Sequence, residues 1–120
     1  MPKVVITTTT FGKVDSSSLE LCRNMGCSVV LNPYQRKVLS HELVELAKDA
    51  EGLIAGTEII SNDVLLKLPH LRVISRCGTG LDNIDLEAAE KLNIEVFNTP
   101  EAVTESVAEL AVGLILDCLR

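Results

Sequence analysis

Short, almost continuously apolar runs alternate along the chain with segments whose apolar residues recur every three or four positions. The runs are rich in Val, Ile and Leu, which is typical of strands covered on both faces. The predicted strands are Lys3–Thr8, Cys27–Asn32, Glu51–Gly56, Leu71–Arg76 and Ile94–Asn98. The predicted helices between them are Ser16–Met25, Ser40–Asp49, Ser61–Leu68 and Ile84–Leu92. This alternation predicts an α/β fold, an open parallel five-stranded sheet with helices on both faces, built from right-handed crossovers.

Residues that favour helix ends support these bounds. Ser40 and Ser61 stand before acidic residues of a first turn and predict N-caps. Any of three polar residues can cap the fourth helix, in which two further residues can form an i,i+4 ion pair. These are Asp82, Asn83 or Asp85 for the cap, and Glu87 with Lys91 for the pair.

The last segment differs from the others. Its helix can begin after Pro100 or at Ser106, which opens a capping box. Almost every residue of Val107–Leu119 is apolar, apart from a narrow stripe at positions 105, 109, 113 and 117. A helix that is apolar around most of its circumference is expected to be buried on more than one side, and a sheet covers only one. We therefore expect a long apolar helix that forms a homo-oligomer through Val107–Leu119, or a chain that is part of a longer protein.

Composition excludes several classes of partner. The 120 residues fit one domain, and a formal charge of −6 without a basic cluster argues against nucleic acid. The longest apolar stretch is too short to span a bilayer, and nothing at the N-terminus predicts a signal peptide, so we expect no membrane partner. The four cysteines lack a C-x-x-C spacing. We therefore expect reduced thiols, no metal site and a cytoplasmic location.

A glycine-containing turn follows the fourth predicted strand. Gly78 and Gly80 match the start of a dinucleotide fingerprint, but Asn83 occupies the position where a third small residue is required. The backbone N–H groups of Gly78, Thr79 and Gly80 suit an anion, and a compact carboxylate fits better than a pyrophosphate. A tight turn with ordinary helix caps is the alternative.

Two other turns follow strands that should end at the same edge of the sheet. Thr7–Lys13 resembles a weak phosphate-binding loop, although a polar turn is the simpler interpretation. Gly56-Thr57-Glu58 has little meaning alone, but it should lie beside the Gly78–Gly80 turn.

Two stretches carry a family resemblance: RVISRCGTGLDNIDLEAAEKLNIEVFNTP, from Arg72 to Pro100, and ESVAELAVGLIL, from Glu105 to Leu116. They resemble the N-terminal part of D-isomer-specific 2-hydroxyacid dehydrogenases, close to the phosphoglycerate dehydrogenase branch. The resemblance is specific over residues 71–120 and looser before them. It implies a flavodoxin-like fold in which residues 1–120 form the N-terminal portion of the substrate-binding (catalytic) domain. It also implies that the nucleotide-binding domain is absent from this chain.

The resemblance further implies roles for individual residues. The Gly78-Thr79-Gly80 amides would hold the carboxylate of a 2-oxo or 2-hydroxy acid, and Thr79 would also contact the cofactor, NAD. Arg76 would lie near the distal group of the substrate, or else form a surface salt bridge. Thr57 would contribute from the turn after the third strand, where phosphoglycerate-type members often carry a basic residue. The acidic Glu58 beside it argues against recognition of a phosphate.

No catalytic residue is expected in this chain, because the family's catalytic Arg, Glu and His would lie beyond Arg120. The resemblance therefore predicts an oxidoreductase portion that is inactive alone and does not bind NAD tightly. The alternative is a stand-alone flavodoxin-like binding or regulatory module that self-associates through its last helix.

Overall fold

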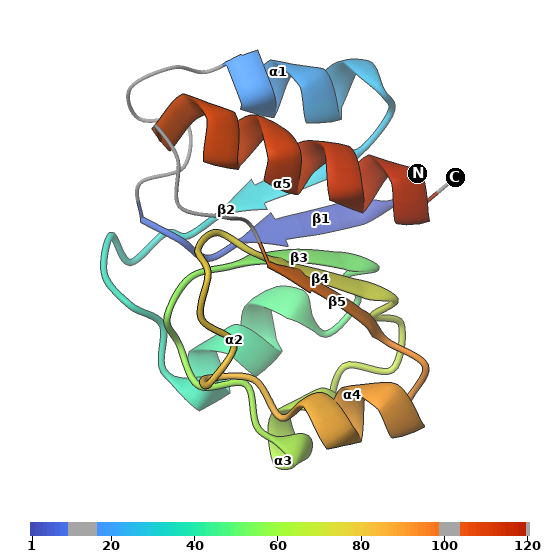
Figure 1. Cartoon of the computed structure of the whole chain (residues 1–120). Helices are drawn as coiled ribbons and strands as arrows, with labels where there is room; N and C mark the ends of the chain where they lie inside the picture. The colour runs from blue at the N-terminus through green and yellow to red at the C-terminus, as the bar shows by residue number, and fades with distance from the viewer. Residues whose placement is uncertain (10–16, 99–103, 120) are drawn as a thin grey trace.

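A computed structural model describes residues 1–9, 17–98 and 104–119, with only the backbone for residues 104–109. Five parallel strands form one sheet in the order β2-β1-β3-β4-β5 (Figure 1). The strands are β1 (Lys3–Ile6), β2 (Ser28–Leu31), β3 (Gly52–Ala55), β4 (Val73–Arg76) and β5 (Glu95–Asn98). This is the flavodoxin-like order, in which the chain reverses its direction of winding between β1 and β3. The predicted fold class is confirmed.

Helices cover both faces of the sheet. α1 (Ser17–Asn24) and α5 (Thr104–Cys118) lie on one face, and α2 (Ser40–Ala47), α3 (Asn62–Leu66) and α4 (Leu86–Lys91) lie on the other (Figure 1). α5 contacts β3, β4 and β5 and packs beside α1. The expectation that only the sheet would cover the last helix was therefore wrong, because α1 covers part of a second side.

The alternation of side chains along each strand divides the core into two layers. Val5, Leu53 and Ile74 face α2, α3 and α4. Val4 and Ile6 point the opposite way, into a layer that α5 completes with Ala111, Val112 and Ile115, all fully buried. Burying one such aliphatic side chain stabilises a fold by about 1.5–3 kcal/mol. The two layers hold the ends of the strands in fixed register.

The helix ends confirm most of the predicted caps. The Ser61 hydroxyl accepts a hydrogen bond from the Val64 N–H at 3.4 Å, and the Asp85 carboxylate accepts one from the Ala88 N–H at 3.0 Å. Ser40, in contrast, is the first helical residue of α2, and the extended Leu39 is the N-cap. The predicted ion pair between Glu87 and Lys91 is present at 3.3 Å.

The expected entry to the last helix at Pro100 lies outside the described residues. The backbone is helical from Thr104, so Ser106 does not begin the helix. The side chains of the expected capping box and of positions 105 and 109 of the polar stripe are not described. None of the described helices is long and apolar enough to cross a bilayer.

Candidate ligand-binding site at the carboxyl edge of the sheet

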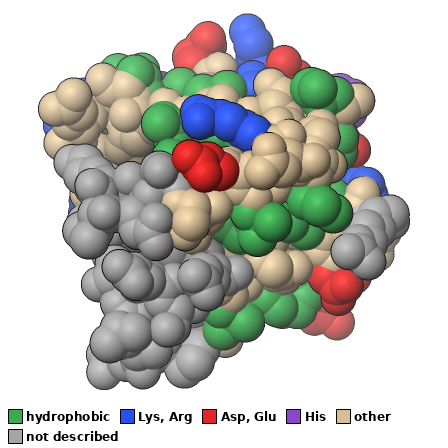
Figure 2. Space-filling model, turned by 90° about the horizontal axis from the view of Figure 1, so that it is seen from above, with side chains coloured by type: hydrophobic (Ala, Val, Ile, Leu, Met, Phe, Trp, Pro, Cys, Tyr) green, Lys and Arg blue, Asp and Glu red, His purple; other side chains and the backbone are tan. Residues whose placement is uncertain are grey.

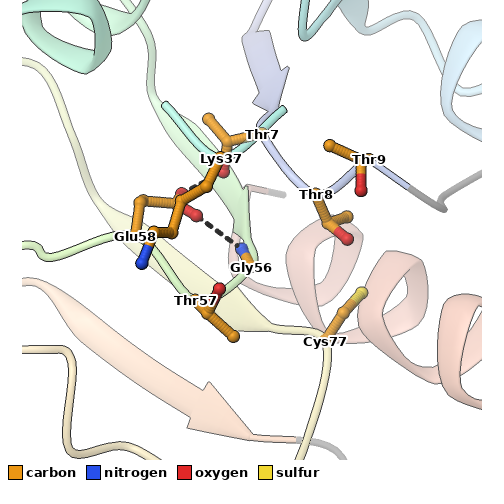
Figure 3. Close-up of a pocket in the computed structure, with 8 residues that line it drawn as sticks. All are labelled: Thr7, Thr8, Thr9, Lys37, Gly56, Thr57, Glu58 and Cys77. Atoms are coloured by element: carbon orange, nitrogen blue, oxygen red, sulfur yellow. Dashed lines mark hydrogen bonds between the residues drawn. The ribbon is translucent and has the colours of Figure 1, made fainter. Parts of the chain in front are cut away.

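A small pocket lies where β1 and β3 end side by side (Figure 3). Its volume is about 190 Å³. Open parallel sheets bind their ligands at this place, because the crossovers on either side of the reversal run to opposite faces and leave a crevice. The lining residues are Thr7, Thr8, Thr9, Lys37, Gly56, Thr57, Glu58 and Cys77.

Glu58 connects the ends of β1 and β3 at this pocket through hydrogen bonds. Its side chain is 2% exposed, and its carboxylate accepts hydrogen bonds from the Thr7 hydroxyl and, at 3.0 Å, from the Gly56 N–H. Figure 3 shows the carboxylate between these two residues. Glu58 is thus a buried structural acid rather than part of an exposed turn, because its oxygen atoms are engaged inside the fold.

The segment between β2 and α2 brings a cation to the pocket. Lys37 lines the pocket with an exposed side chain. Its neighbour Arg36 forms a two-pronged ion pair with Glu42, with both N–H···O distances at 2.8 Å. The Glu42 carboxylate also accepts the Leu39 N–H at 2.9 Å. The hydrogen bonds from Arg36 and then Leu39 lower the pKa of Glu42 to about 2, so this pair fixes the segment at neutral pH.

The turn after β4 depends on a glycine. Gly78 has φ of +148°, and a Cβ atom built on it would lie 1.7 Å from Nη1 of Arg76. The Arg76 side chain therefore folds back over its own turn, where it donates to the Cys77 carbonyl at 3.2 Å and to Oδ1 of Asn83 at 3.3 Å. Only glycine permits this close approach.

The backbone donors of this turn differ from the expectation at one position. The Gly78 N–H donates to the Arg76 carbonyl at 3.0 Å and is not free for an anion. The Thr79 and Gly80 N–H groups have no acceptor among the described residues, and both residues are exposed. The Asn98 side chain holds the turn from β5 by donating to the Thr79 carbonyl at 2.9 Å. The N–H groups of Thr79 and Gly80, two exposed residues that follow the contact between Arg76 and Gly78, thus have no partner among the described residues.

The turn does not complete a dinucleotide site. The Asn83 side chain, at the position of the third small residue, points to the turn after β3 and donates to the Gly56 and Glu58 carbonyls at 3.1 and 2.8 Å. α4 begins only at Leu86, so its first turn does not directly follow the glycines. The residues present therefore fit a small anion and do not fit a pyrophosphate.

Cys77 separates the turn from the pocket. Burial raises the pKa of its thiol to about 11, against the opposing effect of Arg76. The thiol is therefore protonated at neutral pH and is a poor nucleophile. All four cysteines are free thiols, and no group of three or more potential metal ligands occurs within the described ranges.

The predicted site residues fall into two adjoining groups. Gly78, Thr79 and Gly80 form the turn after β4 with Arg76, whereas Thr57 lines the pocket. The two groups meet at Cys77, whose N–H donates to the Ala55 carbonyl at 2.9 Å. Of the Thr7–Lys13 stretch, Thr7–Thr9 lies in the pocket and residues 10–13 lie outside the described part of the chain.

Sequence reasoning missed Lys37 and Cys77 as pocket residues and the link made by Asn83. A signal existed for Lys37, because it follows the strand that neighbours β1 in a flavodoxin-like order. No sequence pattern indicates that the Asn83 amide reaches across to the neighbouring turn.

Residues 4–112 match the family model for the D-isomer specific 2-hydroxyacid dehydrogenase catalytic domain. The chain belongs to this family. The D-3-phosphoglycerate dehydrogenase of Methanocaldococcus jannaschii is 48% identical over 81 residues, which make up 66% of this chain and 15% of that enzyme. The hydroxypyruvate reductase of Thermotoga maritima is 40% identical over 80 residues, 66% of this chain and 26% of that enzyme.

Solved structures of the dehydrogenase family share the fold. The NAD⁺-bound 3-phosphoglycerate dehydrogenase of Entamoeba histolytica superimposes with a TM-score of 0.73 at 31% identity, over 82% of this chain and 33% of that one. The chain spans between about a seventh and a quarter of the length of the two curated relatives named above.

Proposed function

We propose that this chain binds the carboxylate of a small 2-oxo or 2-hydroxy acid, as the substrate-binding portion of an NAD-dependent D-2-hydroxyacid dehydrogenase of the phosphoglycerate dehydrogenase type. The observation that carries the proposal is that the N–H groups of Thr79 and Gly80, two exposed residues next to the contact between Arg76 and Gly78, have no acceptor among the described residues. Carboxylates form short, strong hydrogen bonds with such donors, because the acceptor is charged. The two relatives' names, a phosphoglycerate dehydrogenase and a hydroxypyruvate reductase, support an acid of this class.

The rest of the substrate would extend into the pocket between β1 and β3. Cys77 lines the pocket and precedes the turn, so the distal end of a short acid held at Thr79 would extend toward Thr57 and Lys37. Lys37 would attract a distal anionic or hydroxyl group. The acidity of Glu58 does not by itself exclude an anion there, because its carboxylate is already hydrogen-bonded to Thr7 and Gly56.

NAD would be bound by a part of the enzyme beyond this chain. The described turn after β4 makes no pyrophosphate site, so Thr79 is the residue of this turn that we propose to reach the cofactor. With the family's catalytic Arg, Glu and His expected beyond Arg120, we propose that this portion alone is inactive, and we assign no catalytic residue to it. The free thiols are consistent with a cytoplasmic location.

Self-association through the last helix is part of the proposal. Figure 2 views the face formed by α1 and α5, where hydrophobic side chains gather at the surface. Leu21 on α1 and Leu110 on α5 are each 41% exposed, and Met25, which directly follows α1, is 49% exposed. This observation also favours the second candidate, a stand-alone flavodoxin-like binding or regulatory module that dimerises.

Sedimentation velocity over a range of protein concentrations tests this association. We expect the sedimentation coefficient to rise with concentration in the wild type and to stay lower in Leu110→Glu. A wild-type chain that remains monomeric at high concentration contradicts it.

A titration followed by amide NMR tests the carboxylate site. We expect pyruvate to shift the Thr79 and Gly80 signals, because both N–H groups gain a charged acceptor. Methyl pyruvate, which lacks the carboxylate, is the control and should leave them in place. If pyruvate shifts neither signal, this chain does not hold the carboxylate. If inorganic phosphate instead shifts only Thr7–Thr9, a phosphate-binding function replaces the proposed one.

A further inference from the structure

We infer that Asn83 is a positioning residue that sets the spacing between the turn after β4, which would hold the carboxylate, and the pocket after β3, which would hold the distal group. This inference rests on the proposed function. The Asn83 side chain is half-buried between the two turns and has a hydrogen-bond partner on each. Its Nδ2 donates to Gly56 O at 3.1 Å and Glu58 O at 2.8 Å, and its Oδ1 accepts from Arg76 Nε at 3.3 Å.

The hydrogen-bond partners of the Asn83 side chain require a carboxamide at this position. Two carbonyl oxygens face Nδ2 and one N–H group faces Oδ1, so the side chain must present two donors on one side and an acceptor on the other. The amide cannot be turned over, since its oxygen would then face two carbonyl oxygens. Aspartate has the same shape and retains the acceptor, but it places negative charge against both carbonyls.

The backbone around Asn83 is held independently of its side chain. The Ile60 N–H donates to the Asn83 carbonyl at 2.8 Å, and the Asp85 N–H donates to the Ile60 carbonyl at 2.9 Å. These bonds form a parallel bridge between Ile60 and Ile84. Replacement of the Asn83 side chain therefore leaves the path of the chain intact and removes the link between the turns.

The link continues on both sides of Asn83. On one side Arg76 lies against Gly78, next to the exposed Thr79 and Gly80 amides. On the other side the Glu58 carboxylate binds Thr7 at the end of β1. A ligand that reached from the turn to the pocket would depend on this spacing, whereas a ligand confined to the turn would not.

Asn98 provides a matched control. Its side chain also donates to a turn carbonyl, that of Thr79 at 2.9 Å, but it anchors the turn to β5 and has no described contact with the pocket. Asn83→Asp and Asn98→Asp therefore make the same chemical change at two anchors of one turn, and only the first lies between the turn and the pocket.

The first experiment needs no ligand. Amide relaxation dispersion is measured for wild type, Asn83→Asp and Asn98→Asp. We expect Asn83→Asp to introduce microsecond-to-millisecond exchange at the Gly56 and Thr57 amides, and Asn98→Asp to introduce it only at Thr79 and Gly80. If the exchange contributions at the Gly56 and Thr57 amides are the same in wild type and Asn83→Asp, the inference is wrong.

The second experiment compares pyruvate, which fills only the turn, with 2-oxoglutarate, which carries a distal carboxylate. We expect Asn83→Asp to weaken 2-oxoglutarate binding about tenfold more than pyruvate binding, a difference of roughly 1.4 kcal/mol. A general loss of stability would weaken both equally, and that result contradicts a positioning role. If the wild type binds neither acid, the proposed function fails, and the ligand-free experiment still decides the role of Asn83.

Discussion

The turn after β4 and the turn after β3 lie side by side at one edge of the sheet, and both contain glycine, but they use their backbone differently. In the turn after β3, the Gly56 N–H donates to the Glu58 carboxylate inside the fold. The same carboxylate accepts from Thr7 after β1, so this backbone donor helps to connect β3 to β1 and is not free for a ligand. The turn after β4 keeps the Thr79 and Gly80 N–H groups unpaired among the described residues and is held from outside by side chains.

This difference indicates how a ligand would be recognised. Under the proposed function, the turn with unpaired amides would bind the group common to all substrates of the class, the carboxylate, because backbone donors are the same whatever the sequence. A turn whose donor is already used can contribute only side chains, here Thr57 beside Lys37. The pocket after β3 is therefore where specificity between related acids would reside.

The strongest disruption of the turn after β4 is Gly78→Ala. A Cβ atom would require a rare backbone conformation and would displace Arg76, since φ is +148° and the nearest guanidinium nitrogen is 1.7 Å away. We expect the free energy of unfolding to fall by about 3 kcal/mol, from backbone strain and lost hydrogen bonds. Urea unfolding followed by circular dichroism measures this change.

Gly80→Ala is the matched control for that substitution. No heavy atom lies within 4 Å of a Cβ built on Gly80, so stability should change by less than about 0.5 kcal/mol. If the two substitutions lower the free energy of unfolding equally, the backbone conformation of Gly78 is not what the stability of the turn depends on.

The corresponding disruption of the turn after β3 is Glu58→Ala. It leaves the Gly56 N–H and the Thr7 hydroxyl without their carboxylate partner in a buried place. We expect a loss of about 2 kcal/mol, the cost of an unsatisfied buried group, measured by the same urea titration. Glu87→Ala removes an exposed ion pair with Lys91 and should cost no more than about 0.5 kcal/mol. If Glu58→Ala lowers the free energy of unfolding by no more than Glu87→Ala does, the hydrogen bonds of Glu58 do not stabilise the contact between the ends of β1 and β3.

The fold could be predicted from sequence because its signals are local. The β-branched runs predicted the strands to within two residues at each end, and the expected capping residues located the starts of α3 and α4, where Ser61 and Asp85 are the N-caps. The prediction of Ser40 as an N-cap was wrong. The Glu42 carboxylate accepts the N–H of the N-cap residue Leu39, so α2 does not need a serine cap. A cap made by the third helical residue leaves no distinct trace before the helix.

The site could be predicted only in part, because its geometry depends on contacts between distant residues. The glycines of the turn after β4 were recognised, whereas the loss of the Gly78 N–H to the Arg76 carbonyl depends on a backbone angle. The burial of Glu58 depends on Thr7, 51 positions away. Sequence spacing carries no record of either contact.

The smallest expected effect concerns the segment that presents Lys37 to the pocket. Arg36 and the Leu39 N–H lower the pKa of Glu42 to about 2 from its ordinary value of 4.5. Because the folded-state pKa is the lower one, the contribution of Glu42 to stability is fully present above pH 4.5 and is lost as the pH falls toward 2.

We expect Glu42→Gln to lower the melting temperature slightly at neutral pH, and the difference from wild type to vanish as the pH falls from 4.5 toward 2. Glu45→Gln, whose side chain is 74% exposed and lies 3.9 Å from Lys48, should leave the melting temperature unchanged at neutral pH. If the Glu42→Gln difference persists unchanged at pH 2, the Arg36 pair does not hold this segment, and Lys37 is positioned by other contacts.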